Sequence, residues 1–304
     1  MVYRFQVGDV LPNRESIRQN SLLSQTKDLL RQAGLQARKG LGQHFLVDGS
    51  VLKHILSAAE LNRDEVVVEV GPGLGVLTQA LAEHAGRVVA VEKDENLSRI
   101  LQETLASYGN VSIVNEDILK VDPQALLRER FPDTAAHRYK VVANLPYYIT
   151  SPVLRHFLEA TLKPEMIIVM VQKEVARQIT AKPGEMSLLS VGVQLYGHPR
   201  IVKYVPARSF YPAPDVDSAI LKITVYPRPA VDVEITTFFS VVRAGFSAAR
   251  KQIVNSLAHG LELSKTEAVS LLEKAGIDPR RRAETLSIEE WGRLWQEYAK
   301  AKRP

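Results

Sequence analysis

Short apolar runs alternate with amphipathic segments through the middle of the chain. Runs such as Val66–Val70 and Met166–Gln172 are almost wholly apolar, as is typical of strands that helices cover on both faces. This alternation predicts a doubly wound parallel sheet in an α/β domain. We expect strands at residues 66–70, 87–92, 111–115, 139–143 and 166–172, helices at 77–84 and 95–108, and further strands at 188–196, 201–205 and 217–225, the last two as a hairpin.

The two ends of the chain follow other patterns. Residues 1–35 read as a polar N-terminal extension with one amphipathic helix over 24–33, and a second helix is expected at 48–59 with Asp48 as its N-cap. A proline-rich joint at 227–230 ends the strand signals. We therefore expect an α/β domain over 36–227 and a small all-helical C-terminal domain over 228–304, with helices at 236–258, 265–276 and 287–300.

Composition restricts the class of protein and its expected compartment, but it does not identify a function. The 304 residues suffice for a large and a small domain, and a hydrophobic fraction of 45% fits a soluble protein with a core. The net charge of +5 permits a polyanionic partner but does not demand one. The absence of cysteine excludes disulfides, thiolate metal sites and cysteine nucleophiles. The sequence has neither a membrane-length apolar run nor a signal-peptide core, so we expect a cytoplasmic protein.

A glycine-rich turn follows the first expected strand of the sheet. It reads Gly71-Pro72-Gly73-Leu74-Gly75, and its glycines let backbone approach a ligand at the mouth of the sheet. It is not the dinucleotide fingerprint, because Val76 stands where that motif requires glycine. Alone, such a turn also fits a purely structural role.

Acidic residues follow the next two strands. Glu92 ends one strand and is placed to accept hydrogen bonds from ribose hydroxyls, although a helix-capping role is an alternative. Asp117 follows the next strand, where its carboxylate is suited to an adenine amino group. The glycine turn and the two acids together predict an adenosine pocket. Because no phosphate-binding P-loop is present, we predict S-adenosylmethionine as the cofactor.

The stretch Asn144-Leu145-Pro146-Tyr147-Tyr148-Ile149-Thr150 ends the strand at 139–143. An exocyclic adenine amine is a poor nucleophile, because its lone pair is delocalised into the ring. Two acceptors aimed at its N–H groups favour a tetrahedral nitrogen, and the Asn144 side-chain oxygen and Leu145 carbonyl suit that role. Pro146 would fix the carbonyl's direction, and Tyr147 would stack on a base extruded from its helix. A proline-terminated strand with core aromatics is the alternative interpretation.

These motifs together resemble the ribosomal RNA adenine dimethyltransferase family, bacterial small-subunit (KsgA-like) type. The matching stretches are LGQHFL (41–46), VEVGPGLGVLT (68–78), VEKD (91–94), NEDIL (115–119), NLPYYITSP (144–152), MVQKEVA (170–176) and FYPAPDVDSAI (210–220), within residues 38 to 290. The resemblance implies a Rossmann-like class I methyltransferase domain with a small all-helical C-terminal domain that binds RNA. It also implies transfer of methyl groups from S-adenosylmethionine to N6 of two adjacent adenosines. They lie in the loop of a hairpin near the 3′ end of small-subunit (16S) rRNA, modified during 30S subunit biogenesis.

The resemblance assigns roles to individual residues. Those expected to bind the cofactor are His44, Leu46, Gly71, Gly73, Glu92, Asp117 and Asn144. Those expected to serve catalysis are Asn144, Leu145, Pro146, Tyr147 and Phe210, the last as a second aromatic that sandwiches the target base. Without the family, His44 reads as a packed or capping residue. No metal site is expected.

Basic residues supply the candidates for RNA contact. Arg38 and Lys39 precede the LGQHFL stretch, and Arg243, Arg250 and Lys251 would share one face of a helix over 236–258. Any single one of them also fits a solvated surface charge. The expected partner is small-subunit rRNA within the immature 30S subunit, and we expect a monomer that binds no membrane.

Three other functions compete with this interpretation. One is the related large-subunit methyltransferase class that confers macrolide resistance, against which the helical domain after residue 230 and the FYPAPDVDSAI stretch argue. A second is a DNA adenine methyltransferase, whose motif usually has an acidic first residue or a second proline where this chain has Asn144-Leu145-Pro146. A third is a non-catalytic RNA-binding assembly factor that kept the fold.

Overall fold

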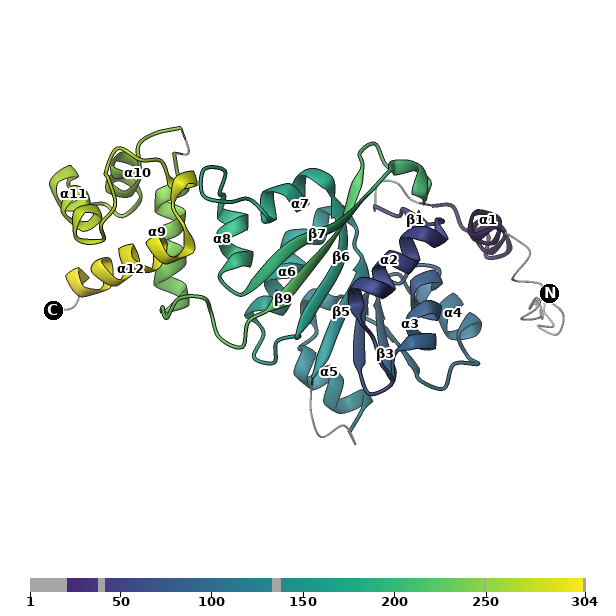
Figure 1. Cartoon of the computed structure of the whole chain (residues 1–304). Helices are drawn as coiled ribbons and strands as arrows, with labels where there is room; N and C mark the ends of the chain where they lie inside the picture. Colours follow the sequence, from purple (N-terminus) through teal and green to yellow (C-terminus); the bar gives the residue numbers. More distant parts are fainter. Residues whose placement is uncertain (1–20, 38–41, 133–137, 249, 303–304) are drawn as a thin grey trace, which may run out of the picture.

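The computed structural model describes residues 21–37, 42–132, 138–248 and 250–302, and its centre is a seven-stranded sheet (Figure 1). Five strands are parallel: β2 (Val66–Val70), β3 (Arg87–Glu92), β4 (Val111–Asn115), β5 (Tyr139–Asn144) and β6 (Met166–Gln172). Two more follow at one side: β9 (Ser218–Val225) is antiparallel to β6, and β7 (Gly197–Val205) is antiparallel to β9, so it runs in the direction of the parallel strands. The five parallel strands and the β7–β9 hairpin confirm the sequence prediction.

The strand order β4-β3-β2-β5-β6-β9-β7 reverses direction between β2 and β5. Chain connections leave these two neighbouring strands toward opposite sides, so a crevice opens beyond their carboxyl ends. The glycine turn follows β2, and the NLPYYIT stretch follows β5. The fold therefore brings two motifs that lie far apart in the sequence to one point.

Helices cover both faces of the sheet because alternate strand residues point to opposite sides. On one face, Val67 and Val142 pack with α2 (Gly49–Ala59) and α3 (Val76–His84). On the other face, Val68 and Val141 pack with α5 (Pro123–Arg130), α6 (Thr150–Glu159), α7 (Lys173–Ile179) and α8 (Leu188–Gln194). Another helix, α4 (Glu95–Thr104), contacts β3 and β4.

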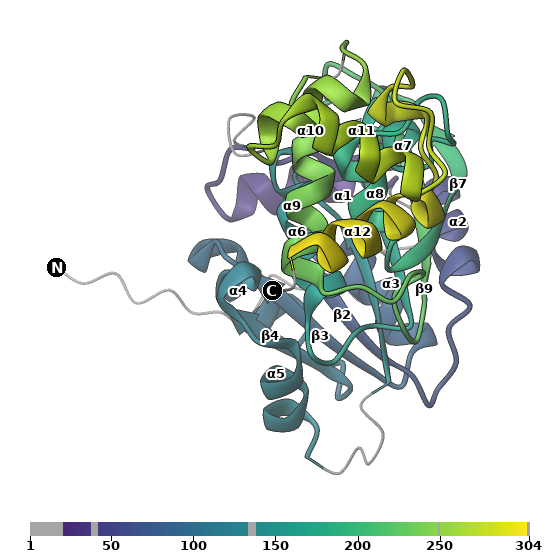
Figure 2. The same cartoon turned by 90° about the vertical axis from the view of Figure 1, so that its left-hand side faces the viewer.

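The chain after β9 is helical and lies beside the sheet (Figure 1). It contains α9 (Ile235–Phe246), α10 (Ile253–Gly260), α11 (Lys265–Lys274) and α12 (Ile288–Lys302), which Figure 2 shows from their outer side. Phe238, Leu257 and Trp291 continue the same hydrophobic cluster that covers the second sheet face. These helices are thus packed onto the α/β part through shared apolar contacts.

Helix α1 (Leu22–Gln32) belongs to the expected N-terminal extension, and it packs against β1, the glycine turn and the start of α4. Leu30 is buried in a small cluster with Phe45, Leu74 and Leu97. Phe45 lies in β1 (Phe45–Leu46), which pairs antiparallel with β8 (Phe210–Tyr211). This two-stranded sheet joins the LGQHFL stretch to the FYPAP stretch.

Two predicted elements were wrong, and one was too long. The expected strand at 188–196 is helix α8, because Ser187 and Ser190 form a capping box at its start. The single helix expected over 236–258 ends at Phe246 and resumes at Ile253, whose N–H donates to the Arg281 carbonyl at 2.7 Å instead of continuing a helix. The helix expected over 95–108 ends at Thr104.

Candidate active site

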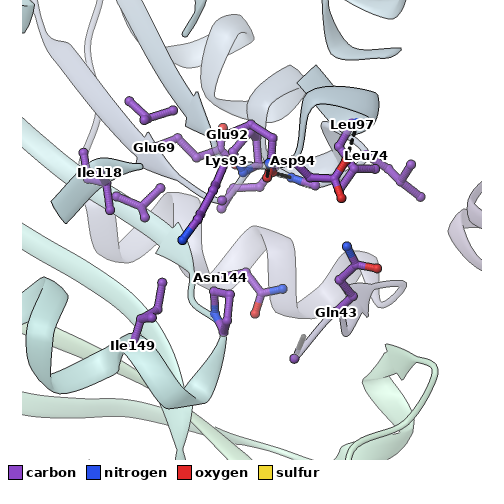
Figure 3. A pocket seen from close by; sticks show the side chains of 18 of the residues that line it. Gln43, Glu69, Leu74, Glu92, Lys93, Asp94, Leu97, Ile118, Asn144 and Ile149 are labelled. Atoms are coloured by element: carbon purple, nitrogen blue, oxygen red, sulfur yellow. Dashed lines mark hydrogen bonds between the residues drawn. The ribbon is translucent and has the colours of Figure 1, made fainter. Parts of the chain in front are cut away.

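A cavity of about 410 Å³ opens at the carboxyl edge of β2, β3 and β5 (Figure 3). That volume lies in the ordinary range of small-molecule sites. Its walls come from the LGQHFL stretch, the glycine turn, the ends of β3 and β4, and the NLPYYIT stretch. The predicted site residues that line it are His44, Leu46, Gly71, Gly73, Glu92, Asp117, Asn144 and Pro146.

The glycine turn has a backbone that other residues would strain. Gly71, Gly73 and Gly75 have φ values of 65°, 61° and 83°, all in the left-handed region. A Cβ on Gly75 would also come within 2.9 Å of a Leu101 methyl group, so the turn fits tightly onto α4. The N–H of Gly73 donates to Glu92 Oε2 at 3.1 Å. The turn is thereby fixed to the acidic end of the next strand.

Glu92 is buried at the end of β3, and only 7% of its surface is exposed. One carboxylate oxygen accepts from the N–H of Gly73 and the other from the N–H of Asp94 at 2.9 Å. Burial raises the pKa of Glu92, and these two N–H groups oppose the rise. A carboxylate has about four acceptor positions, so Glu92 is held in place and still has capacity for hydroxyl donors.

Asp117 lies at the same edge but already has partners. Its carboxylate accepts from Lys93 Nζ at 2.9 Å and from the N–H of Leu119 at 3.1 Å. The bond from Lys93 holds the pKa of Asp117 below its usual range. Lys93 reaches across the pocket in Figure 3, and 74% of its side chain is exposed. Exposed ion pairs are weak, so a ligand amine can compete with Lys93 for Asp117.

Glu69 is a site residue that the sequence analysis did not single out. It lies within the apolar strand β2, is 1% exposed, and lines the cavity (Figure 3). Its Oε2 is buried without a hydrogen-bond partner in the part of the chain that the structure describes. Burial raises the pKa of Glu69 to about 8. The signal in the sequence was a carboxylate inside Val66-Val67-Val68-Glu69-Val70, which is costly to bury without a function.

Asn144 ends β5 with its side chain oriented by a specific contact. Its Nδ2 donates to the His44 carbonyl at 2.9 Å. Because a carbonyl only accepts, this bond identifies the nitrogen end of the amide. The Asn144 Oδ1 is therefore the end left for a donor. Helix η4 (Tyr147–Ile149) begins just beyond: the N–H of Ile149 donates to the Pro146 carbonyl, and the N–H of Thr150 donates to the Tyr147 carbonyl.

The tyrosines of this stretch face different surroundings. Tyr147 stacks on His44 with ring centroids 5.9 Å apart, and its hydroxyl bonds to Ser218 Oγ at 2.7 Å. The cavity wall contains Tyr148 instead, which is 65% exposed and which the sequence analysis overlooked. Tyr147 thus lies on the side of β9, away from the end of the cavity that contains Glu92 and Asp117.

Other predicted residues lie outside the cavity. Leu145 is buried in the core, and so is Phe210, which is 3% exposed and pairs with Leu46 between β8 and β1. For Phe210 to stack on a base, the FYPAP stretch would have to rearrange. Its role stays a prediction.

The candidates for RNA contact do not form the expected single face. Arg243 is exposed on α9, whereas Arg250 and Lys251 are exposed in the turn between α9 and α10. The prediction that they share one face of a continuous helix was therefore wrong. Arg38 and Lys39 lie outside the described residues. Across the described ranges, the structure contains no cluster of acidic and histidine side chains that could hold a metal, and no helix long and apolar enough to cross a membrane.

The sheet order and the acid-lined cavity at its switch point define a class I methyltransferase fold. A solved 23S rRNA methyltransferase, ErmE, is similar, with a TM-score of 0.65 and 30% identity over 83% of this chain and 98% of that chain. A dimethyladenosine transferase from Plasmodium falciparum has a TM-score of 0.69, covering 84% of this chain and 98% of that chain. At 22% identity the latter likeness concerns the fold alone.

Sequence comparison defines the family. Residues 34–300 match the family described as ribosomal RNA adenine dimethylase. A protein of Dehalococcoides mccartyi named ribosomal RNA small subunit methyltransferase A is 52% identical over 280 residues, covering 92% of this chain and 94% of its own length. A protein of the same name from Bacillus cereus is 44% identical over 277 residues, or 89% of this chain and 94% of its own. The chain belongs to the ribosomal RNA adenine dimethylase family.

Proposed function

We propose that this protein uses S-adenosylmethionine to dimethylate N6 of two adjacent adenosines in the loop of a 3′-terminal hairpin of small-subunit rRNA. The reaction belongs to assembly of the 30S subunit in the cytoplasm. The observation that carries the proposal is the amide of Asn144, whose Nδ2 is tied to His44 so that Oδ1 remains as an acceptor at the edge of the cavity.

The residues of the cavity fit S-adenosylmethionine. Glu92 has acceptor capacity for ribose hydroxyls, and Asp117 can accept from an amine when Lys93 moves away. Glu69, buried with an unpartnered oxygen, suits a ligand that carries positive charge, because a nearby cation would lower its raised pKa. When bound, the cofactor supplies an electrophilic methyl group.

The chain's own groups prepare the adenine amine. Asn144 Oδ1 and the Leu145 carbonyl accept its two N–H groups and favour the tetrahedral nitrogen that carries a lone pair. Tyr147 supports the base plane from the side of β9. The bound cofactor would supply the methyl group and keep the electrons of the broken methyl–sulfur bond, and the cationic amine would then release its proton to water. No side chain is required as a base before transfer. In a second round the monomethylated amine has one N–H left, and one of these two acceptors would orient it.

The choice of small-subunit rRNA as the substrate is supported by sequence identity to the relatives. The relatives named small subunit methyltransferase A reach 52%, whereas the 23S rRNA methyltransferase is 30% identical. The test is to incubate the protein with methyl-labelled S-adenosylmethionine and either immature small subunits or large subunits, and then to digest the RNA to nucleosides. We expect label in N6,N6-dimethyladenosine from small subunits only. Label in large-subunit RNA, or in a different nucleoside, would refute the proposal.

A further inference from the structure

The cofactor cavity occupies one side of Asn144, and this placement restricts the approach of RNA. The cavity walls come from β2, β3 and the end of β4, whereas Tyr147 faces Ser218 of β9. Strands β9 and β7 continue the sheet in that direction, and Val205 of β7 pairs with Ser218. An adenosine that meets Tyr147 therefore brings its flanking nucleotides toward the carboxyl end of β7, three strand spacings, or roughly 14 Å, from Asn144.

An exposed tyrosine with two cations marks that end of β7. Tyr204 is 47% exposed although most large apolar side chains here are buried. Lys173 Nζ lies 5.5 Å from its ring centroid and Arg177 Cζ lies 5.7 Å from it. Both distances are within cation–π range. Lys173 and Arg177 come from α7, which follows β6 at the same edge of the sheet.

The cations at this tyrosine come from α7. Those of strand β7 itself, Arg200 and Lys203, are on the other face of the sheet, where Lys203 Nζ lies 3.1 Å from His54 Nε2 of α2. Nearby carboxylates have partners: Glu174 pairs with Arg177 at 3.1 Å, and Asp217 accepts from the N–H of Ala207. Cations on an edge strand also discourage pairing with another sheet. That reason accounts for the lysine and arginine on β7, but not for an exposed tyrosine held between two further cations.

We propose that Lys173, Arg177 and Tyr204 form an RNA-contact patch that binds the strand flanking the target adenosine. The cations would contact phosphates, and the tyrosine ring would contact a base, as in proteins that hold single strands. The turn between α9 and α10, with Arg250 and Lys251, lies on the same side of the molecule (Figures 1 and 2). The patch is thus a second point of attachment, and this inference rests on the proposed function.

The test is binding of immature small subunits to the full-length protein across a range of salt concentrations. Tyr204→Ala should weaken binding by about 5- to 100-fold, because one stacked base is lost, whereas Tyr204→Phe should keep most of the affinity. Arg177→Ala should reduce the slope of log affinity against log salt by about one. The matched control is Lys163→Ala, since Lys163 lies 5.9 Å from the Tyr196 ring but at the opposite edge of the sheet, before β6.

All four variants should bind S-adenosylmethionine and melt as the unmodified protein does, which separates RNA binding from folding. Unchanged subunit affinity for both Tyr204→Ala and Arg177→Ala would overturn the inference while leaving the proposed function intact. An equal loss of affinity in Lys163→Ala would also overturn the inference, because removing any positive charge from the surface would then have the same effect. Failure of the unmodified protein to bind small subunits would overturn the proposed function and the inference with it.

Discussion

Replacing Asn144 with alanine isolates the chemical step. The variant loses two things: the hydrogen bond from Nδ2 to the His44 carbonyl, and the Oδ1 acceptor at the cavity edge. The first loss is that of one ordinary hydrogen bond, about 1 kcal/mol. The second acts where the amine becomes tetrahedral, and by analogy with other preorganised polar groups it costs about 3–4 kcal/mol.

The two losses have different readouts. We expect the Asn144→Ala protein to bind S-adenosylmethionine within about tenfold of the unmodified affinity, and its methylation rate to fall by about 100- to 1,000-fold. The assay is single-turnover methylation of small subunits with enzyme in excess, with cofactor affinity measured separately by calorimetry. Asn144→Asp is the matched control, because it restores an acceptor but cannot donate to His44. It should react at least ~10-fold faster than the alanine variant.

A different pattern would refute this reasoning. If Asn144→Ala reacts within threefold of the unmodified rate (about 0.6 kcal/mol), Oδ1 does not act in the transition state. If Asn144→Asp is as slow as the alanine variant, the lost function is donation to His44 rather than acceptance from the amine.

Glu92, Tyr147 and Glu69 can each be tested by substitution. Glu92→Ala should weaken S-adenosylmethionine binding by about 1–3 kcal/mol in calorimetry, because ribose hydroxyls lose a buried acceptor; unchanged affinity in a folded variant would remove Glu92 from the site. Tyr147→Ala should impair both subunit capture and single-turnover rate, by about 1–3 kcal/mol for a lost stacking surface, whereas Tyr147→Phe loses only the bond to Ser218 and should be mild; equal damage in both would contradict the stacking role. The free energy of unfolding should fall between pH 4.5 and 8, by at most about 1.4 kcal/mol per pH unit, because folded Glu69 keeps its proton to about pH 8 while the unfolded chain loses it near 4.5. Denaturant titrations across this range should show that fall and its reduction in Glu69→Gln; an identical slope in both proteins would exclude Glu69 as its source.

The central sheet was predictable because burial on both faces leaves a continuous apolar run. Val66–Val70 and Met166–Gln172 are such strands, and the polar residues that follow strands identified the edge where Glu92, Asp117 and Asn144 meet. The same criterion misassigned 188–196, where the apolar run is a buried helix set by its serine capping box. An apolar run by itself does not separate the two.

What the sequence did not reveal depends on contacts between distant segments. The break between α9 and α10 depends on the Arg281 carbonyl, which lies in the loop between α11 and α12. The pairing of Asp117 with Lys93 and the exposure of Tyr148 rather than Tyr147 at the cavity depend on side-chain direction. Local patterns contain none of this, because spacing fixes which element a residue belongs to and not what it contacts.

The most direct test of the account is the position and number of methyl groups on the RNA. Small subunits that lack the modification are incubated with the protein and S-adenosylmethionine, and the 3′-terminal fragment of their rRNA is released by a targeted nuclease for mass spectrometry. We expect two adjacent adenosines in the hairpin loop, each with two methyl groups on N6. Methylation confined to another fragment, or an unmodified hairpin loop after complete cofactor turnover, would contradict it.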